Sequence, residues 1–202
     1  MTYWIDSQHI LHGPNVHYEP IPEAFTQEQI NPWSIILHSN AGPHKTIWQA
    51  LWKYVARTDI KIEPHFIGPD SEGVIVQLLP LNVRADCNAK ANAWWIPYGP
   101  GHVRVGAISF ETQDNGAATL ATTPYNPKQF EALVGACAAI GHKYGNPYQS
   151  PATWDDRGIG YHCQYPEWSV YVGKTCPGAA RIYQMDELRR QAALTCACEP
   201  GV

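Results

Sequence analysis

One apolar run, residues 33–38, constrains the fold more than any other feature of this sequence. It contains Trp-Ser-Ile-Ile-Leu-His after a proline, and an apolar run of this length predicts a buried strand. Residues 105–111 predict another strand, and residues 60–67 and 74–79 predict two more. Residues 69–73, which join the last two, contain the Asp and Gly that a turn requires.

Helical patterns alternate with these predicted strands. Apolar side chains recur at helical spacing over residues 46–57, and Thr46 can cap the first turn. Asn126, followed by a proline and then by Gln129, predicts a strong helix start, because this pattern combines a capping box with a proline in the first turn. We expect this second helix to end near Gly141. Strands interleaved with helices predict an α/β domain in which helices flank a central mixed sheet.

Two shorter predictions concern the second half of the chain. Residues 150–153 predict a short helical start, and the last helix is expected within residues 179–197, with Arg189 and Arg190 solvated. Cys137 belongs to the apolar stripe of the preceding helix, so we expect it in the core.

The remaining segments bear on domain organisation. A length of 202 residues fits one domain with a sizeable core. Residues 1–30 show no strand or helix period, and we expect them to form an extended arm packed on the domain of residues 31–202. The irregular spacing of the three histidines in this arm favours packing or solvated roles. Residues 82–101 predict a long irregular connection, which could wall a cleft.

Charge and composition exclude several classes of protein. The net charge is −4 at pH 7 without a basic stripe, so we expect neither nucleic-acid binding nor membrane binding by charge. No apolar run approaches the ~20 residues of a transmembrane helix. The chain begins without a basic segment or an apolar core, which predicts that it has no signal peptide and is made in a cytoplasm. Its six cysteines are therefore expected to be free thiols or metal ligands rather than disulfides.

A histidine and a cysteine near the end of the chain predict part of a metal site. His162 follows a Gly-Tyr pair, and Cys176 lies in a Lys-Thr-Cys-Pro-Gly turn. A neutral imidazole and a thiolate suit zinc, but a catalytic zinc site usually takes three protein ligands and a water. His38 is the best candidate for the third ligand, because it ends a predicted strand before a polar loop, where α/β sheets bind ligands. His65 is expected to be a packed strand histidine instead.

Two further side chains could act beside this metal. Glu111 ends a strand in which a carboxylate is costly to bury, so it is either paired, exposed or a general base. Lys174 lies two residues before Cys176, and in an extended segment both side chains point to the same side. Lys174 could therefore stabilise a developing oxyanion. The plainer alternative is that Lys174 is a surface charge and Cys176 a buried thiol.

The order of these segments resembles that of the zinc-dependent N-acetylmuramoyl-L-alanine amidases of the peptidoglycan-recognition-protein-like class. Among them, it looks most like the amidase domains of phage endolysins, in particular those of phages of actinobacteria. The resemblance covers roughly residues 33–185, and the turn that contains Cys176 is its most specific part. The matching segments are residues 35–39, 64–67 with the Gly73 turn, 107–111, 160–162 and 174–178.

The resemblance implies a zinc ion and two catalytic side chains. The implied zinc ligands are His38, His162 and Cys176, and the implied catalytic residues are Glu111 and Lys174. Some members of the family use a tyrosine instead of the glutamate, but Pro64 occupies that position here, which favours Glu111. Residues 86–88 (Asp-Cys-Asn) replace a frequent Trp-His-Ala-Gly segment, so the contacts of this loop with substrate are not carried over.

The implied activity is hydrolysis of the amide bond between N-acetylmuramic acid and L-alanine in peptidoglycan, with residues 31–202 as the zinc amidase catalytic domain. The resemblance also implies a monomer that is made in a host cytoplasm and released to the cell wall with the help of a holin. The alternative is a module of the same fold that binds peptidoglycan without cutting it, as in relatives that lack the cysteine ligand. The presence of Cys176, Lys174 and Glu111 favours the enzyme.

Overall fold

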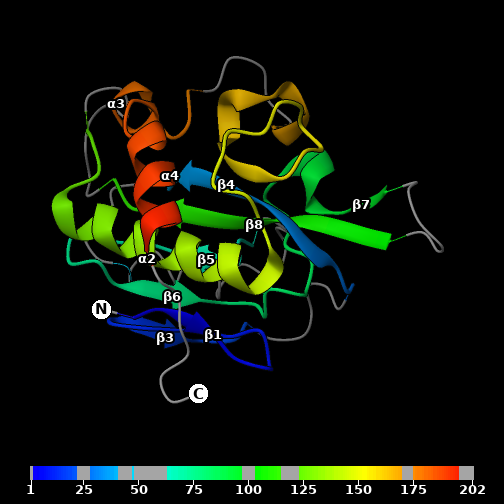
Figure 1. The fold of residues 1–202 in the computed structure, drawn as a ribbon, viewed down its shortest axis with the longest axis horizontal. Helices are drawn as coiled ribbons and strands as arrows, with labels where there is room; N and C mark the ends of the chain where they lie inside the picture. The colour runs from blue at the N-terminus through cyan, green and yellow to red at the C-terminus, as the bar shows by residue number, and fades with distance from the viewer. Residues whose placement is uncertain are drawn as a thin grey trace.

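The computed structural model describes residues 2–21, 28–40, 47, 63–96, 103–114, 123–169 and 175–195. Within these ranges, seven strands form one central sheet (Figure 1). They are β3 (Val16–Tyr18), β4 (Asn31–Ser39), β5 (Phe66–Ile67), β6 (Ile75–Gln77), β7 (Trp94–Ile96), β8 (Val103–Thr112) and β9 (Gly158–Tyr161). Their order is β3-β6-β5-β8-β4-β9, with β7 paired to β8. Parallel and antiparallel pairs both occur, which confirms the predicted α/β class with a central mixed sheet.

The strands β4 and β8 form the centre of this sheet. They pair in parallel, and β9 pairs in parallel with the other edge of β4. Residues 35–37 of β4 are completely buried because both faces of the strand are covered, and the two central strands predicted from the sequence are confirmed. Since β4 and β8 run in the same direction, their penultimate residues His38 and Glu111 are register partners at the C-terminal ends of the central strands.

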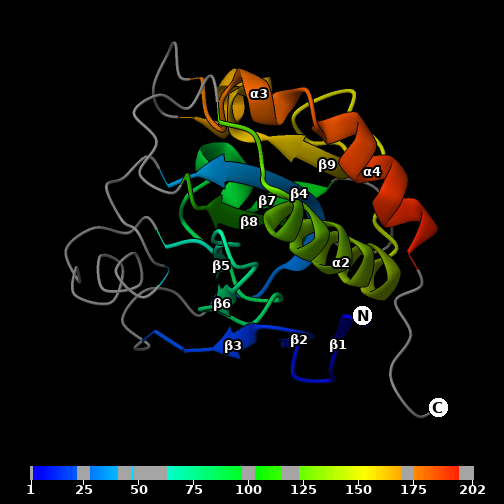
Figure 2. The same cartoon turned by 90° about the vertical axis from the view of Figure 1, so that its left-hand side faces the viewer.

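Helices and short 3₁₀ turns cover opposite faces of the sheet. The helices are α2 (Pro127–Tyr144), α3 (Ala179–Ile182) and α4 (Met185–Leu194). Figure 2 shows α2 and α4 on the same side of the central strands, where they share a core with Ile35 and Phe110. The other face carries η1 (Ala89–Asn92) and η4 (Pro166–Trp168), which pack on Ile36 and Ala107. Because side chains alternate along a strand, His38 lies on this second face.

The start of α2 agrees closely with the sequence. Oδ1 of Asn126 accepts a hydrogen bond from the backbone N–H of Gln129 (2.9 Å), and Oε1 of Gln129 accepts one from the backbone N–H of Asn126 (3.2 Å). These two bonds complete the predicted capping box. The helix continues past Gly141 and is capped by Gly145, whose φ of 65° suits a glycine. Cys137 is completely buried in the core, as predicted.

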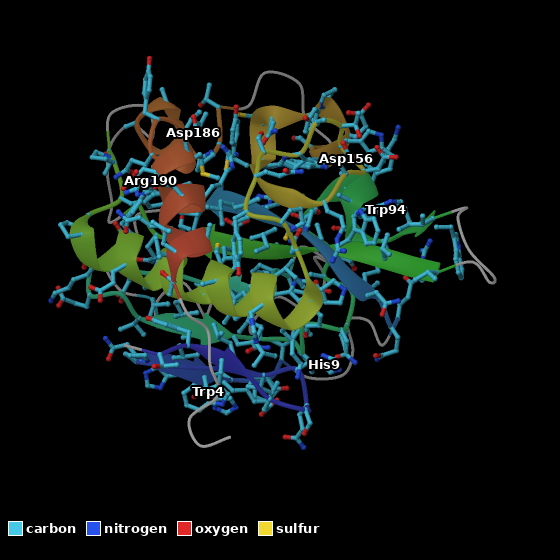
Figure 3. The ribbon with its side chains drawn as sticks, viewed as in Figure 1. Trp4, His9, Trp94, Asp156, Asp186 and Arg190 are labelled. Carbon is cyan, nitrogen blue, oxygen red and sulfur yellow. The ribbon has the colours of Figure 1, made fainter. Side chains whose placement is uncertain are left out.

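Residues 2–21, expected to be part of an extended arm, contain three short strands. β1 (Trp4–Ile5) pairs with β2 (Leu11–His12), and β3 pairs with β6 at the edge of the central sheet. The carboxylate of Asp6 accepts two backbone hydrogen bonds in the turn between β1 and β2 and contacts Nε2 of His12 at 2.7 Å. The ring of His9 stacks on Tyr144 of α2. Figure 3 shows His9 at the opposite end of the molecule from α3.

Three local predictions differ from the structure. The described part of residues 82–101 is not wholly irregular, because β7 pairs with β8 and η1 precedes it. Residues 150–153 form no helix, since the backbone N–H of Thr153 donates to the carboxylate of Asp156 in a turn. Arg189 is buried rather than solvated, because its guanidinium donates to the carbonyl of Ile159 at 2.8 Å.

Two predicted elements lie partly outside the described residues. The helix expected over residues 46–57 lies outside them except for Ile47, which is helical and buried. The strand expected over residues 60–67 is described from residue 63 and is limited to β5. It pairs antiparallel with β6 across the predicted turn. Among the helices that the structure describes, none has the length and apolar character needed to cross a membrane.

Candidate metal centre

Three of the predicted site residues come together at the C-terminal edge of the sheet. One ring nitrogen of His38, one of His162 and the sulfur of Cys176 lie within 4.8 Å of one another. All three residues are buried, and the centroids of the two imidazole rings are 4.2 Å apart. They come from the end of β4, from η3 (His162–Gln164) directly after β9, and from the turn before α3.

Strand pairing and two hydrogen bonds hold these segments together. β9 pairs with β4 up to the residues that precede His162 and His38, which brings both histidines to the same edge. The backbone N–H of Cys163 donates to the carbonyl of Cys176 at 3.1 Å. The backbone N–H of Ser39 donates to Sγ of Cys176 at 3.0 Å, and such a bond is strengthened by negative charge on the sulfur.

This donor set is suited to a metal ion. Transition metals such as zinc bind imidazole nitrogens and thiolates, whereas magnesium and calcium bind oxygen ligands. The three donors are buried, and the sheet register and the loop hydrogen bonds hold them close together. His38, His162 and Cys176 therefore form a candidate metal site.

Glu111 lies next to this cluster. Its Oε1 is 3.7 Å from Nδ1 of His38, and its side chain is 14% exposed. This position follows from the sheet register, because Glu111 and His38 are direct partners in the β4–β8 pair and point to the same face. A carboxylate that lies beside the ligand atoms and still reaches solvent can exchange protons with a molecule bound there.

The loop before η1 contributes a contact with His38 and a nearby thiol, neither of which was predicted from the sequence. Asn88 is completely buried, and its Oδ1 lies 2.7 Å from Nε2 of His38. Burial and the nearby charge of Glu111 raise the pKa of the half-buried Cys87 thiol well above its ordinary value, so this thiol stays protonated at neutral pH. One feature of the sequence could have drawn attention to this loop: residues 86–88 differ from the segment that is frequent in the amidase family.

His65 is separate from the metal cluster, as expected for a packed histidine. It is completely buried, with Nδ1 3.3 Å from Oγ of Ser109 and Nε2 2.8 Å from the carbonyl oxygen of Val83. Burial lowers the pKa of His65 to about 4, so its ring is neutral at pH 7. Both ring nitrogens have partners within the protein, which leaves neither available to a metal.

Lys174, the predicted partner of the oxyanion, lies outside the described residues, which resume at Thr175. The structure thus brings together the three expected ligands and the expected base, and the role of Lys174 stays a prediction. Cys163, directly after His162, is half-buried, and burial raises the pKa of its thiol.

Comparison with known proteins gives structural neighbours only. No protein-family model and no curated protein matches the chain. The N-acetylmuramoyl-L-alanine amidase LysC from Clostridium intestinale URNW is 14% identical over 90% of this chain and 99% of its own, with a TM-score of 0.57. A mutant endolysin from Bacillus subtilis is 18% identical over 89% and 97% of the two chains, with a TM-score of 0.57. The Staphylococcus aureus hydrolase AmiA, solved with its ligand, is 14% identical over 91% and 85%, with a TM-score of 0.61.

These alignments span most of each neighbour, so the likeness concerns the whole fold rather than a shared motif. At such low identity a structural likeness establishes the fold, and function has to be argued from the site. The chain has the fold of the N-acetylmuramoyl-L-alanine amidases, as the order of its motifs predicts.

Proposed function

We propose that this chain is a zinc-dependent N-acetylmuramoyl-L-alanine amidase, which hydrolyses the amide bond between N-acetylmuramic acid and L-alanine in peptidoglycan. The observation that carries the proposal is the buried cluster of His38, His162 and Cys176 at the end of the central strands, with Glu111 beside it. The neighbouring structures support the same activity, because they include an N-acetylmuramoyl-L-alanine amidase and an endolysin.

The cluster fits zinc by the chemistry of its donors. His38 and His162 would each provide one imidazole nitrogen, and Cys176 would provide a thiolate; three such ligands leave a position open, as catalytic zinc sites require. Bound zinc supplies Lewis acidity, which polarises a carbonyl and makes water more acidic. The backbone N–H of Ser39 donates to this sulfur and would stabilise the thiolate once a metal is bound.

Glu111 is the proposed general base and, later in the reaction, the general acid. Its carboxylate takes a proton from the attacking water and returns it to the amine of L-alanine that leaves. The register of β4 and β8 holds Oε1 of Glu111 3.7 Å from the ring of His38, so the proton acceptor is placed before substrate arrives. Its partial exposure keeps it in reach of a substrate that enters from solvent.

Lys174 is the proposed partner of the oxyanion that develops on the lactyl carbonyl. The support for this role is its place two residues before Cys176, together with the family resemblance. The proposed setting is that of a phage endolysin: a monomer, made in a host cytoplasm and released with the help of a holin, acts on the cell wall without a nucleic-acid or membrane partner.

Zinc content and turnover of purified cell walls test the proposal together. The isolated protein should contain about one zinc ion per chain and should release new amino groups of L-alanine from the walls. Glu111→Gln should retain zinc and lose about 100-fold or more of the turnover, because the amide cannot accept the proton. Glu131→Gln, on the exposed side of α2, is the matched control and should keep both properties.

Different failures lead to different conclusions. A protein that holds no zinc contradicts the metal assignment. A protein that holds zinc and binds walls, but releases no amino groups, is the peptidoglycan-binding module instead of the enzyme. Full turnover in Glu111→Gln would remove the base assignment and leave the metal site in place.

A further inference from the structure

We propose that Asn88 positions the metal ligand His38, because it holds the imidazole in the tautomer that carries a proton on Nε2 and a lone pair on Nδ1. Asn88 comes from the loop before η1, and His38 is the penultimate residue of β4, so the contact joins two segments that are 50 residues apart in the sequence. The inference rests on the proposed function, since it concerns the metal site of that enzyme.

The partners of the Asn88 side chain determine which way its carboxamide points. Its Nδ2 lies 3.4 Å from the carbonyl oxygen of Ala107, and a carbonyl can only accept a hydrogen bond. The amide nitrogen therefore faces Ala107, and Oδ1 faces His38. Because an amide oxygen also only accepts, Nε2 of His38 has to be the donor across the 2.7 Å contact.

A neutral imidazole with its proton on Nε2 has its lone pair on Nδ1. Nδ1 of His38 is the atom that lies 3.7 Å from Oε1 of Glu111, so the lone pair is on the side of the proposed base. Histidines that bind metals usually donate their other N–H to an acceptor, which fixes both the ring orientation and the basicity of the ligand nitrogen. Asn88 has the position and the chemistry of such an acceptor.

Asn88 is itself held firmly. Its backbone N–H donates to Oδ1 of Asn92 at 2.6 Å, and its carbonyl accepts from the N–H of Ala91 at 2.9 Å. The residue is completely buried, so a water molecule cannot easily replace its side-chain oxygen. Because both the backbone and the side chain of Asn88 form hydrogen bonds, its carboxamide can hold the imidazole of His38 in one orientation. A preorganised site requires such a fixed orientation of its ligands.

The first test uses the unaltered protein. Long-range ¹H–¹⁵N correlation spectra of protein labelled at histidine report which ring nitrogen carries the proton. We expect the Nε2–H tautomer for His38, with and without added zinc, at a pH where the ring is neutral. A proton on Nδ1 would overturn the proposal.

The second test measures zinc affinity by competition with a chromophoric chelator. Asn88→Leu removes the acceptor at similar size and should weaken zinc binding by about 10-fold to 100-fold. Asn88→Asp keeps an acceptor oxygen and should bind zinc nearly as tightly as the unaltered protein. The matched control is Asn146→Leu, because Asn146 is also buried but donates to Gly158 at the far end of β9.

Each outcome bears on the role of Asn88. Equal affinity in Asn88→Leu and the unaltered protein would overturn it, and so would a loss in Asn88→Asp or Asn146→Leu as large as that in Asn88→Leu. If the unaltered protein has no affinity for zinc, the proposed function fails, and the tautomer of His38 then decides the Asn88 contact by itself.

Discussion

Acid should destabilise the folded protein through His65, a residue outside the candidate metal site. Burial lowers the pKa of His65 to about 4 from an ordinary value of 6.5. Between these two values the unfolded chain binds a proton that the folded chain does not, so stability rises with pH across this window. The contribution is fully present above pH 6.5, and it is lost as the pH falls toward 4.

The expected loss can be worked from the same two values. Each pH unit between them corresponds to about 1.4 kcal/mol, so the difference between 6.5 and about 4 amounts to about 3 kcal/mol. His65 is completely buried, so solvent does not screen this free-energy difference. A loss of this size is a large part of the roughly 5–15 kcal/mol by which a domain is stable.

Urea unfolding at several pH values between about 7 and 4 measures this loss. His65→Gln cannot titrate, and His142→Gln on the exposed side of α2 is the control. Acid also protonates other groups and would release a bound metal in all three proteins, so the difference between their pH profiles isolates His65. The unaltered protein and His142→Gln should lose about 3 kcal/mol more than His65→Gln. Three parallel profiles would refute the reasoning.

Two further substitutions test the metal cluster and the helix start. Cys176→Ser replaces a thiolate by a weaker ligand and should lower zinc affinity at least about 10-fold in a chelator competition. The control, Cys163→Ser, should bind zinc as the unaltered protein does. Equal zinc affinity in the two variants would contradict the assignment of Cys176 as a ligand. Asn126→Ala removes the cap of Gln129 and should lower the free energy of unfolding by about 1 kcal/mol in urea, and an unchanged midpoint would show that the cap contributes nothing.

The parts of the fold that can be predicted from the sequence are those with a local cause. β4 is recognisable because it is covered on both faces, which makes residues 35–37 an unbroken apolar run. The start of α2 is recognisable because Asn126 and Gln129 cap each other within one turn. His38 could be predicted as a site residue because it lies near the C-terminal end of a strand, where parallel sheets place their functional side chains.

Features that depend on contacts between distant segments could not be predicted in this way. β7 is a strand because it pairs with β8, and the pattern of residues 82–101 does not indicate this pairing. Asn88 is an ordinary polar loop residue in the sequence, and its role emerges only when the loop meets His38. Arg189 has charged neighbours on its helix, which suggests a solvated face. Its guanidinium nevertheless donates a hydrogen bond to a carbonyl of β9.

Arg181 shows how such distant contacts build the site itself. Its side chain is completely buried, and a buried charge is costly unless hydrogen bonds satisfy it. The guanidinium donates to Oγ of Ser39, to Oγ1 of Thr112 and to the carbonyls of Gln113 and Thr123. Ser39 and Thr112 directly follow His38 and Glu111, while Arg181 belongs to α3, after the turn that contains Cys176. One buried side chain therefore connects the ends of β4 and β8 to the segment that follows Cys176, and its hydrogen bonds satisfy a charge that would otherwise be costly to bury.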